Sequence, residues 1–228
     1  MSSGRKPDRV AAVIFDMDGV LVDSEPFWHA AELQVFRALG VPLDPPMCLE
    51  TTGLRPDEVV RYWYERFPWP GEPKEAERKL VDEVTRMVHA HGQARPGVAH
   101  ALAYLRPLGL PLAIASSSPY RLIEAVCARL GIRDAFSVTA SAEEEPFGKP
   151  HPGVYLSAAA KLNVPAPACL AIEDSVNGVV AAKAARMKCL AVPEPDLLAD
   201  RRLGIADLVL PSLERIEEAA ALFGLVGS

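Results

Sequence analysis

Short apolar runs recur along the chain and indicate buried strands. The first covers residues 10–15, is rich in β-branched side chains and is stopped by Asp16. A continuous apolar run of this length is typical of a strand buried on both faces, as in a parallel sheet covered by helices. The same pattern predicts further strands at residues 110–115, 136–140, 169–172 and 190–192.

Helical patterns lie between these runs, at residues 98–105, 120–130, 153–162 and 176–185. Gly131 follows the second of them, and glycine is common just beyond a helix C-terminus. Because strands and helices alternate, the pattern predicts an α/β fold, a doubly wound (Rossmann-like) parallel sheet.

Residues 25–92 interrupt this alternation. They contain helical patterns at 27–39 and 74–91, all three tryptophans and no convincing strand, and prolines punctuate the loops. The simplest interpretation is a helical domain inserted after the first strand. We therefore expect residues 1–24 and 93–228 to form the core domain and residues 25–92 to form the insert.

Composition limits the possible partners. Half of the 228 residues are apolar, 24% are charged and the formal net charge is −6. The chain has no run of Lys and Arg that would form a nucleic-acid patch. No stretch approaches the ~18 apolar residues of a membrane span. We therefore expect neither nucleic acid nor membrane as a partner.

The expected compartment is the cytoplasm. The four cysteines are far apart and show no C-x-x-C spacing, which favours reduced thiols over a disulfide framework. Residues 1–9 are polar and basic, and the apolar run that follows is too short for a signal peptide. No long apolar heptad pattern stands out, so a monomer is the expected state.

Polar residues that can handle a metal ion or a phosphate group follow several predicted strands. In open parallel sheets, ligands bind beyond the carboxyl ends of the strands. Any one of these groups has a simpler explanation, but their coincidence at strand ends indicates a site. The groups are Asp16 and Asp18, Ser116 to Ser118, and Glu173 to Ser175, with Lys149 in a nearby proline-rich loop.

Asp16 and Asp18 belong to the run Asp16-Met17-Asp18-Gly19, which taken alone could be an ordinary turn. Alternate residues at a strand end can also point toward one pocket and surround one cation. Asp174, at the end of another strand, could complete such a site. Hard oxygen ligands of this kind suit Mg²⁺ rather than zinc.

Ser116 and Lys149 are candidates for holding a phosphate group. Ser116 ends an apolar run and precedes Ser117, Ser118, a proline and a predicted helix, which is the signature of a helix cap but also of an anion site at a helix N-terminus. A single lysine is usually solvated, but beside several acids and a phosphate an ammonium group would neutralise charge.

Together these segments resemble the haloacid dehalogenase-like hydrolase superfamily. The run from Asp16 to Ser24, a serine after the next apolar strand, the loop Lys149-Pro150-His151-Pro152 and the run Glu173-Asp174-Ser175-x-x-Gly178 occur in the expected order. Within it, the chain is most similar to the β-phosphoglucomutase-like branch and its phosphatases of 2-deoxyglucose 6-phosphate and hexitol phosphates. The resemblance covers nearly the whole chain.

The resemblance implies a set of roles. Asp16 would attack phosphorus and form an aspartyl-phosphate, and Asp18 would give and then take a proton. Asp16, the backbone carbonyl of Asp18 and Asp174 would bind Mg²⁺, with Glu173 supporting the site. Ser116, the backbone at Ser117, and Lys149 would hold the phosphoryl group. The helical insert would be a cap that closes over the sugar.

For the substrate, the resemblance implies a small sugar phosphate, namely a hexose 6-phosphate, 2-deoxyglucose 6-phosphate or a hexitol phosphate. Candidate substrate contacts at the mouth of the cleft and on the cap are Glu25, Trp28, Arg55 and Asn177. Tryptophan can offer an apolar face to a sugar, although Trp63 and Trp69 could equally pack the interior of the cap.

Two alternatives to a phosphatase stay open. The mutases of this branch carry a histidine ten residues after the second aspartate, and here that position is Trp28, with His29 next to it. An indole donates one hydrogen bond and does not exchange protons as imidazole does, which favours hydrolysis over transfer to a second sugar hydroxyl. A non-catalytic protein that binds phosphorylated metabolites is the other alternative.

Overall fold

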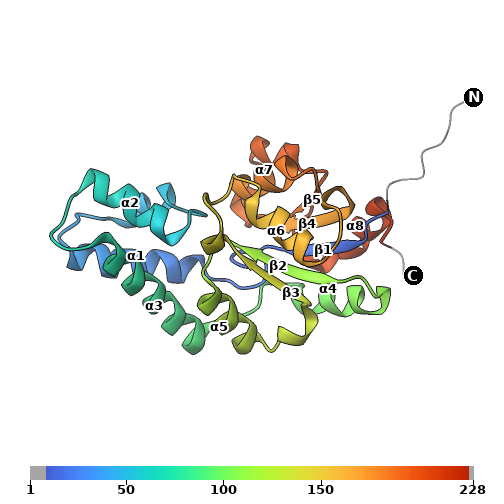
Figure 1. The fold of residues 1–228 in the computed structure, drawn as a ribbon, viewed down its shortest axis with the longest axis horizontal. Helices are drawn as coiled ribbons and strands as arrows, with labels where there is room; N and C mark the ends of the chain where they lie inside the picture. The colour runs from blue at the N-terminus through green and yellow to red at the C-terminus, as the bar shows by residue number, and fades with distance from the viewer. Residues whose placement is uncertain (1–8, 226–228) are drawn as a thin grey trace, which may run out of the picture.

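The computed structural model describes residues 9–225 of the chain. The centre of the structure is a parallel sheet of six strands. Its strand order is β3–β2–β1–β4–β5–β6, with β1 in the interior (Figure 1). The strands are β1 (Ala12–Phe15), β2 (Leu112–Ser116), β3 (Val138–Ser141), β4 (Cys169–Glu173), β5 (Lys188–Ala191) and β6 (Leu208–Val209). The polar N-terminal stretch noted in the sequence lies, for residues 1–8, outside the described residues.

Helices alternate with these strands and cover both faces of the sheet. Those of the core are α4 (Val98–Leu105), α5 (Tyr120–Leu130), α6 (Gly153–Lys161), α7 (Val176–Ala184) and α8 (Ile216–Phe223). Every strand pair is parallel, so the predicted doubly wound α/β fold is confirmed. The two-residue strand β6 and helix α8 were not predicted, because their apolar runs are short.

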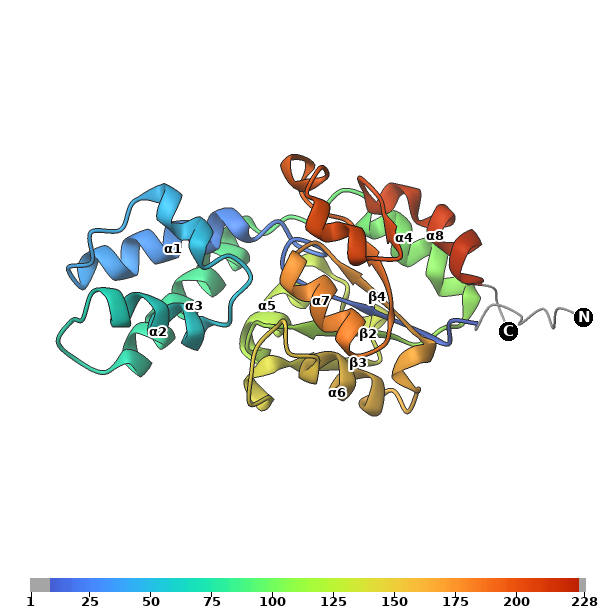
Figure 2. The ribbon, with the colours of Figure 1, turned by 90° about the horizontal axis from the view of Figure 1, so that it is seen from above.

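The two faces of the sheet carry different side chains. Along β1, Val13 and Phe15 belong to the larger buried cluster, which includes residues of α4, α5 and α8. Ala12 and Ile14 point to the opposite face, where α6 and α7 pack on a cluster rich in alanine. Figures 1 and 2 show α6 and α7 on one side of the sheet and α4 on the other. Small side chains let α6 and α7 approach the strands closely.

Three helices follow β1 and lie together beside the carboxyl ends of the strands (Figure 2). They are α1 (Glu25–Ala38), α2 (Pro56–Arg66) and α3 (Pro73–His91), and we call this segment, residues 25–91, the cap. Its interior contains Phe36, Trp63, Trp69 and Leu80, all buried. Trp63 and Trp69 therefore pack the cap itself.

Helix α2 was missed in the sequence pattern, which predicted only the other two. It starts at a proline, carries Glu58 in a capping-box arrangement and buries Val59, Val60 and Trp63 on one side. Its many charged residues hide this narrow apolar stripe. The predicted division into two domains, at residues 24/25 and 92/93, stays a prediction.

The two segments that connect cap and core run side by side. The amide of Asp23 donates to the carbonyl of Gln93 at 3.1 Å, and the amide of Arg95 donates to the carbonyl of Leu21 at 3.1 Å. The chain therefore leaves the core for the cap, and returns from the cap to the core, at one place.

Within residues 9–225 there is no helix with the length and hydropathy to cross a bilayer.

Candidate active site

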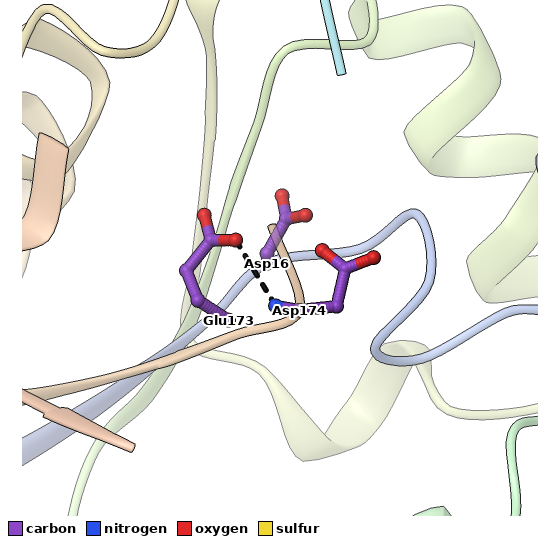
Figure 3. A group of neighbouring side chains, drawn as sticks. All are labelled: Asp16, Glu173 and Asp174. Carbon is purple, nitrogen blue, oxygen red and sulfur yellow. Dashed lines mark hydrogen bonds between the residues drawn. The ribbon is translucent and has the colours of Figure 1, made fainter. Parts of the chain in front are cut away.

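Carboxyl groups from two neighbouring strands meet at the edge of the sheet. Asp16 follows β1, Glu173 is the last residue of β4, and Asp174 follows it. One oxygen of each lies within 4.8 Å of one oxygen of the others (Figure 3). We call these residues the carboxylate cluster. The parallel pairing of β1 with β4 places them together, as the strand-end pattern predicted.

A buried ammonium group ties this cluster together. The Nζ of Lys149 lies 2.7 Å from Oδ1 of Asp16 and 2.6 Å from Oε1 of Glu173, and it donates to the carbonyl of Ala115 at 3.2 Å. The Lys149 side chain is 3% exposed. Burial alone would lower the pKa of Lys149, but the charges of Asp16 and Glu173 outweigh it and raise that pKa above its ordinary value.

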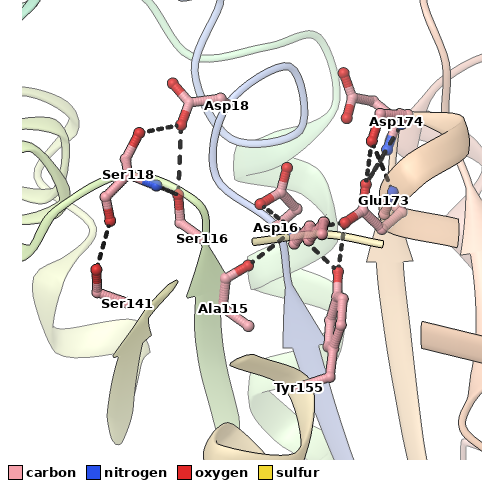
Figure 4. Close-up of polar contacts among 12 residues, drawn as sticks. Asp16, Asp18, Ala115, Ser116, Ser118, Ser141, Tyr155, Glu173 and Asp174 are labelled. Atoms are coloured by element: carbon pink, nitrogen blue, oxygen red, sulfur yellow. Dashed lines mark hydrogen bonds and ion pairs between the residues drawn. The ribbon is translucent and has the colours of Figure 1, made fainter. Parts of the chain in front are cut away.

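The two oxygens of Glu173 are occupied by neighbouring donors. Oε1 accepts from Lys149 and, at 2.6 Å, from the hydroxyl of Tyr155 on α6. Oε2 accepts from the amide of Asp174 and from the amide and hydroxyl of Ser175 (Figure 4). Glu173 is fully buried. It is thus better placed to hold Lys149 and Asp174 in position than to bind a ligand itself.

Glycines make room for this arrangement. Gly178, in the first turn of α7, lies so close to Glu173 that a Cβ there would fall 1.9 Å from the carboxyl carbon. Gly19 has a φ of +73°, and its Cβ would fall 1.9 Å from Oδ2 of Asp174. Side chains at these positions would displace the carboxyl groups.

The charges in the cluster are not balanced. Burial raises the pKa of Asp16 to about 7 against the opposing charge of Lys149, with Glu173 and Asp18 adding repulsion. Burial, followed by repulsion from Glu173 and Asp16, raises the pKa of Asp174 well above its ordinary value. A divalent cation would relieve this repulsion, and carboxylate oxygens are the ligands that hard cations prefer. The cluster therefore fits a metal ion of that kind.

The side chain of Asp18 lies apart from the carboxylate cluster and is held by a ring of donors. Its Oδ1 accepts from the Ser24 hydroxyl at 2.6 Å and from the Trp28 indole at 3.0 Å. Its Oδ2 accepts from the hydroxyls of Ser118 at 2.7 Å and Ser116 at 3.4 Å (Figure 4). These bonds fix the carboxyl group in one orientation, between the core and the start of the cap.

The serine run after β2 forms the wall opposite the carboxylate cluster. The amide of Ser118 donates to the Ser116 hydroxyl at 3.0 Å, which closes a tight turn before α5. Within the described part of the chain, the hydroxyl of Ser117 is buried and has no hydrogen-bond partner. An unpaired buried hydroxyl is costly, so it is suited to bind a polar ligand.

A cavity opens between these walls and the cap. Asp16, Asp18, Ser117, Lys149 and Asp174 line it from the core. The cap contributes Glu25, Trp28, His29, Glu32, Thr51 and Thr52. Of the proposed substrate contacts, Glu25 and Trp28 therefore face the cavity.

Arg55 and Asn177 are not among the described residues that line the cavity. Arg55 instead joins the cap to the core, since its Nη1 donates to the carbonyls of Ala142 at 2.9 Å and Glu145 at 2.8 Å. The amide of Gly148 donates to Glu58 of α2 at 3.2 Å. Asn177 lies in the first turn of α7. In this structure Arg55 is a tether between cap and core.

Glu32 is a buried acid that the sequence did not single out. It lies on α1 and is 3% exposed, although it borders the cavity. Its Oε2 accepts from Thr51 at 2.8 Å and from the Trp63 indole at 3.0 Å. Burial raises the pKa of Glu32 to about 7, although both hydrogen bonds act to lower it.

Other contributors were also missed, namely Ser24, Ser118 and Tyr155. Ser24 and Ser118 do stand in runs that were noted, next to Asp23 and Ser117. Nothing in a sequence tells which hydroxyl of such a run will reach Asp18. Tyr155 is a core position of a helix by its pattern, and only the fold brings its hydroxyl to Glu173.

The raised pKa of Glu32 predicts a pH-dependent stability. A carboxyl group whose pKa is higher in the folded than in the unfolded chain opposes folding once the pH rises from about 4.5 through about 7. Replacing it by glutamine, which keeps an acceptor for Thr51 and Trp63, removes this cost. The difference in the free energy of unfolding between Glu32→Gln and wild type should therefore shift in favour of the variant by up to about 3 kcal/mol between pH 4.5 and pH 8.

Urea unfolding of both proteins at the two pH values measures this difference. Glu65→Gln is the matched control, because Glu65 is an exposed carboxylate of the same cap and water solvates its charge in both states. Parallel pH trends for wild type and Glu32→Gln would contradict the burial of a titrating Glu32.

Comparison with known proteins identifies the family of this chain. Residues 10–186 match the family model of the haloacid dehalogenase-like hydrolases. The chain is 44% identical over 212 residues to hexitol phosphatase B of Escherichia coli (strain K12), covering 92% of this chain and 96% of that protein.

Solved structures show the same fold. CbbY of Rhodobacter sphaeroides in complex with xylulose-(1,5)bisphosphate superposes with a TM-score of 0.81 at 29% identity, covering 91% of this chain and 96% of that one. β-Phosphoglucomutase of Clostridium difficile gives a TM-score of 0.83 at 23% identity, with 94% and 97% covered. The family-model match over residues 10–186 and the 44% identity to hexitol phosphatase B show that the chain belongs to the haloacid dehalogenase-like hydrolase family.

Proposed function

We propose that this protein is a magnesium-dependent phosphatase of small sugar phosphates that works through an aspartyl-phosphate at Asp16. The substrates would be a hexose 6-phosphate, 2-deoxyglucose 6-phosphate or a hexitol phosphate. The observation that carries the proposal is the buried Asp16, bonded to Lys149 at 2.7 Å and facing a cavity that also contains the Asp18 carboxyl group. The 44% identity to hexitol phosphatase B supports the sugar substrate.

In this proposal the two aspartates divide the chemistry. Asp16 attacks phosphorus and the sugar oxygen leaves, so that the phosphoryl group is held on Asp16. Asp18 gives a proton to the leaving oxygen and then takes one from the water that releases phosphate. The hydroxyls of Ser116 and Ser118 can rotate, so Asp18 can change its protonation without moving.

The phosphoryl group would be held by the serine run and the lysine. Ser117 offers its unpartnered hydroxyl and the backbone of its turn, and Lys149 offers a fixed positive charge beside Asp16. Ser116 keeps the turn closed through its bond with Ser118. Lys149 would offset the negative charge of the transferring group, and Ser117 would donate hydrogen bonds to it.

Mg²⁺ would be bound by Asp16 and Asp174, with the backbone carbonyl of Asp18 as a further ligand. Glu173 would act from behind them, since its own oxygens are bonded to Lys149, Tyr155 and Ser175. When bound, the ion supplies positive charge that offsets the carboxylates and the phosphoryl oxygens. The choice of Mg²⁺ over another hard cation is part of the proposal.

The cap would close over the sugar and exclude bulk water. Glu25 and Trp28 face the cavity and are the proposed sugar contacts of the cap entrance, whereas Arg55 is used to hold the cap against the core. We further propose that the protein works in the cytoplasm as a monomer. The free and buried state of Cys48, Cys127, Cys169 and Cys189 supports a reducing compartment.

Hydrolysis is favoured over mutase chemistry by the contact that Trp28 makes. Its indole donates to Asp18 at 3.0 Å. By sequence spacing, Trp28 is the tenth residue after Asp18, the position at which the resemblance places the histidine of the mutases. His29 instead reaches Thr52 and Glu25, at 3.5 Å in both cases. An indole cannot take a proton from Asp18 and so has no means of delaying its reaction with water.

The first test is phosphate release from a panel of phosphorylated sugars and p-nitrophenyl phosphate. We expect turnover with Mg²⁺, loss of turnover with a chelator, and a fall of roughly 10³-fold or more in Asp16→Asn. Asp134→Asn, which changes an exposed aspartate of the core, is the control. Full activity of Asp16→Asn would refute the nucleophile, and preference for a nucleotide or phosphoglycolate would refute the sugar substrate.

The second test separates phosphatase from mutase. Glucose 1-phosphate is supplied with a glucose bisphosphate activator, and glucose 6-phosphate is captured as it forms by a coupled dehydrogenase. Because the Trp28 indole exchanges no proton with Asp18, we expect free phosphate and no captured glucose 6-phosphate. Formation of glucose 6-phosphate faster than phosphate release would support the mutase alternative.

A further inference from the structure

The cap end of the cavity combines acids and hydroxyls with the apolar side chains of Trp28, Leu54 and Val59. It contains the carboxyl groups of Glu25 and Glu32 and the hydroxyls of Thr51 and Thr52. Among the described residues that line the cavity, Lys149 is the one lysine or arginine, and its ammonium is already bonded to Asp16 and Glu173. The other basic side chain of this lining is His29, and its Nε2 already lies 3.5 Å from Oε1 of Glu25.

Glu32 has one oxygen that the cap does not use. Thr51 and Trp63 both donate to Oε2, and no described residue donates to Oε1. The side chain is 3% exposed and that small exposure borders the cavity. Oε1 is not one of the fully buried atoms without a partner, so it keeps some exposure, and Glu32 borders the cavity. A ligand that supplies an O–H can therefore reach it and form a charge-assisted hydrogen bond there.

The position of Glu32 is rigid. The single hydroxyl proton of Thr51 is shared between Oε2 of Glu32 at 2.8 Å and the carbonyl of Cys48 at 3.0 Å, so both acceptors keep the Thr51 side chain in place. Trp63 is fully buried in the cap interior and stacks on Phe67. A carboxyl group held by such partners cannot swing away from a misfitting ligand, which is the condition for selecting between substrates.

We propose that Glu32 is a specificity-determining residue that accepts a hydrogen bond from a hydroxyl of the substrate's polyol chain, the part remote from the reacting phosphate. The cavity would then select monophosphates whose polyol chain is uncharged and reject bisphosphates. This inference rests on the proposed phosphatase function, and it names the hydroxyl-bearing chain as the part of the substrate that the cap recognises. A second phosphate at the cap end would meet the two carboxyl groups of Glu25 and Glu32, with no lysine or arginine in the described lining there and with His29 already paired with Glu25. Like charges brought together in a partly dry cavity repel strongly. The structurally similar CbbY, at 29% identity, was solved with a bisphosphate, so the fold itself does not impose this selection.

The test measures kcat/KM at pH 8 for hexitol 6-phosphate, the corresponding hexitol bisphosphate and p-nitrophenyl phosphate. Wild type should prefer the monophosphate over the bisphosphate by roughly 10-fold or more. In Glu32→Gln the ratio of hexitol 6-phosphate to p-nitrophenyl phosphate should fall by roughly 10-fold, because a charge-assisted hydrogen bond is replaced by a neutral one. The ratio of bisphosphate to monophosphate should rise in the same variant.

Opposite changes for two substrates of one variant distinguish selection from damage to the fold. Glu65→Gln, which removes an exposed charge from the same cap, should leave both ratios at their wild-type values. A variant Thr52→Lys, which adds a cation at the cap end, should raise the bisphosphate ratio further.

Other outcomes would contradict either the role of Glu32 or the proposed phosphatase function. Equal losses on all three substrates in Glu32→Gln, or a wild type that accepts the bisphosphate as readily as the monophosphate, would overturn the role of Glu32. A wild type that hydrolyses p-nitrophenyl phosphate but no sugar monophosphate would overturn the proposed function, and the inference with it. Folding of each variant is checked by its urea midpoint.

Discussion

The buried ammonium of Lys149 is the interaction on which the site depends. It lies between Asp16 and Glu173 with 3% of its side chain exposed, so its charge is stable there only because both carboxylates are present. The carboxylates in turn could not stand so close without it. Removing Lys149 would leave buried carboxylates without a cation, which is a severe penalty.

This dependence explains why so many elements converge on one point. β1 and β4 supply the acids, the loop after β3 supplies the lysine, and α6 supplies Tyr155 to hold Glu173. Gly178 on α7 leaves the space that the Glu173 carboxyl group fills. The fold therefore brings three carboxyl groups and one ammonium group together, so negative charge is in excess. This excess is the physical reason for expecting a metal ion at Asp16 and Asp174.

Much of this could be predicted from the sequence, because the core obeys simple rules. Buried parallel strands are continuous apolar runs, and their carboxyl ends lie on one edge of the sheet. The order of these runs along the chain is therefore enough to predict that Asp16 and Asp174 lie together. Lys149 stands in a loop beyond the run 136–140, and only the fold shows that its ammonium group reaches Asp16. The charge-rich helix α2 and the two-residue strand β6 were missed, because a narrow apolar stripe or a very short run gives little periodicity.

The remaining details depend on contacts between distant parts of the chain. Arg55 follows a glycine-containing loop and was expected to touch the sugar, but its guanidinium satisfies carbonyls of the core at Ala142 and Glu145. From the sequence, Glu32 would be expected to be a solvated residue on the surface of a helix. Only the fold brings Thr51 and Trp63 to it and makes it a buried acid at the cavity. Tertiary placement of polar groups is not encoded in local periodicity.

Asp16 is the centre of the account, and its role can be observed directly. A sugar phosphate carrying a radiolabelled phosphoryl group is mixed with enzyme and Mg²⁺, quenched in acid within one turnover, and the protein is digested and its labelled peptide sequenced. The account predicts label on Asp16, labile to hydroxylamine as an acyl phosphate is, and none in Asp16→Asn. Rapid release of phosphate with no label on the protein, or label on another residue, would contradict it.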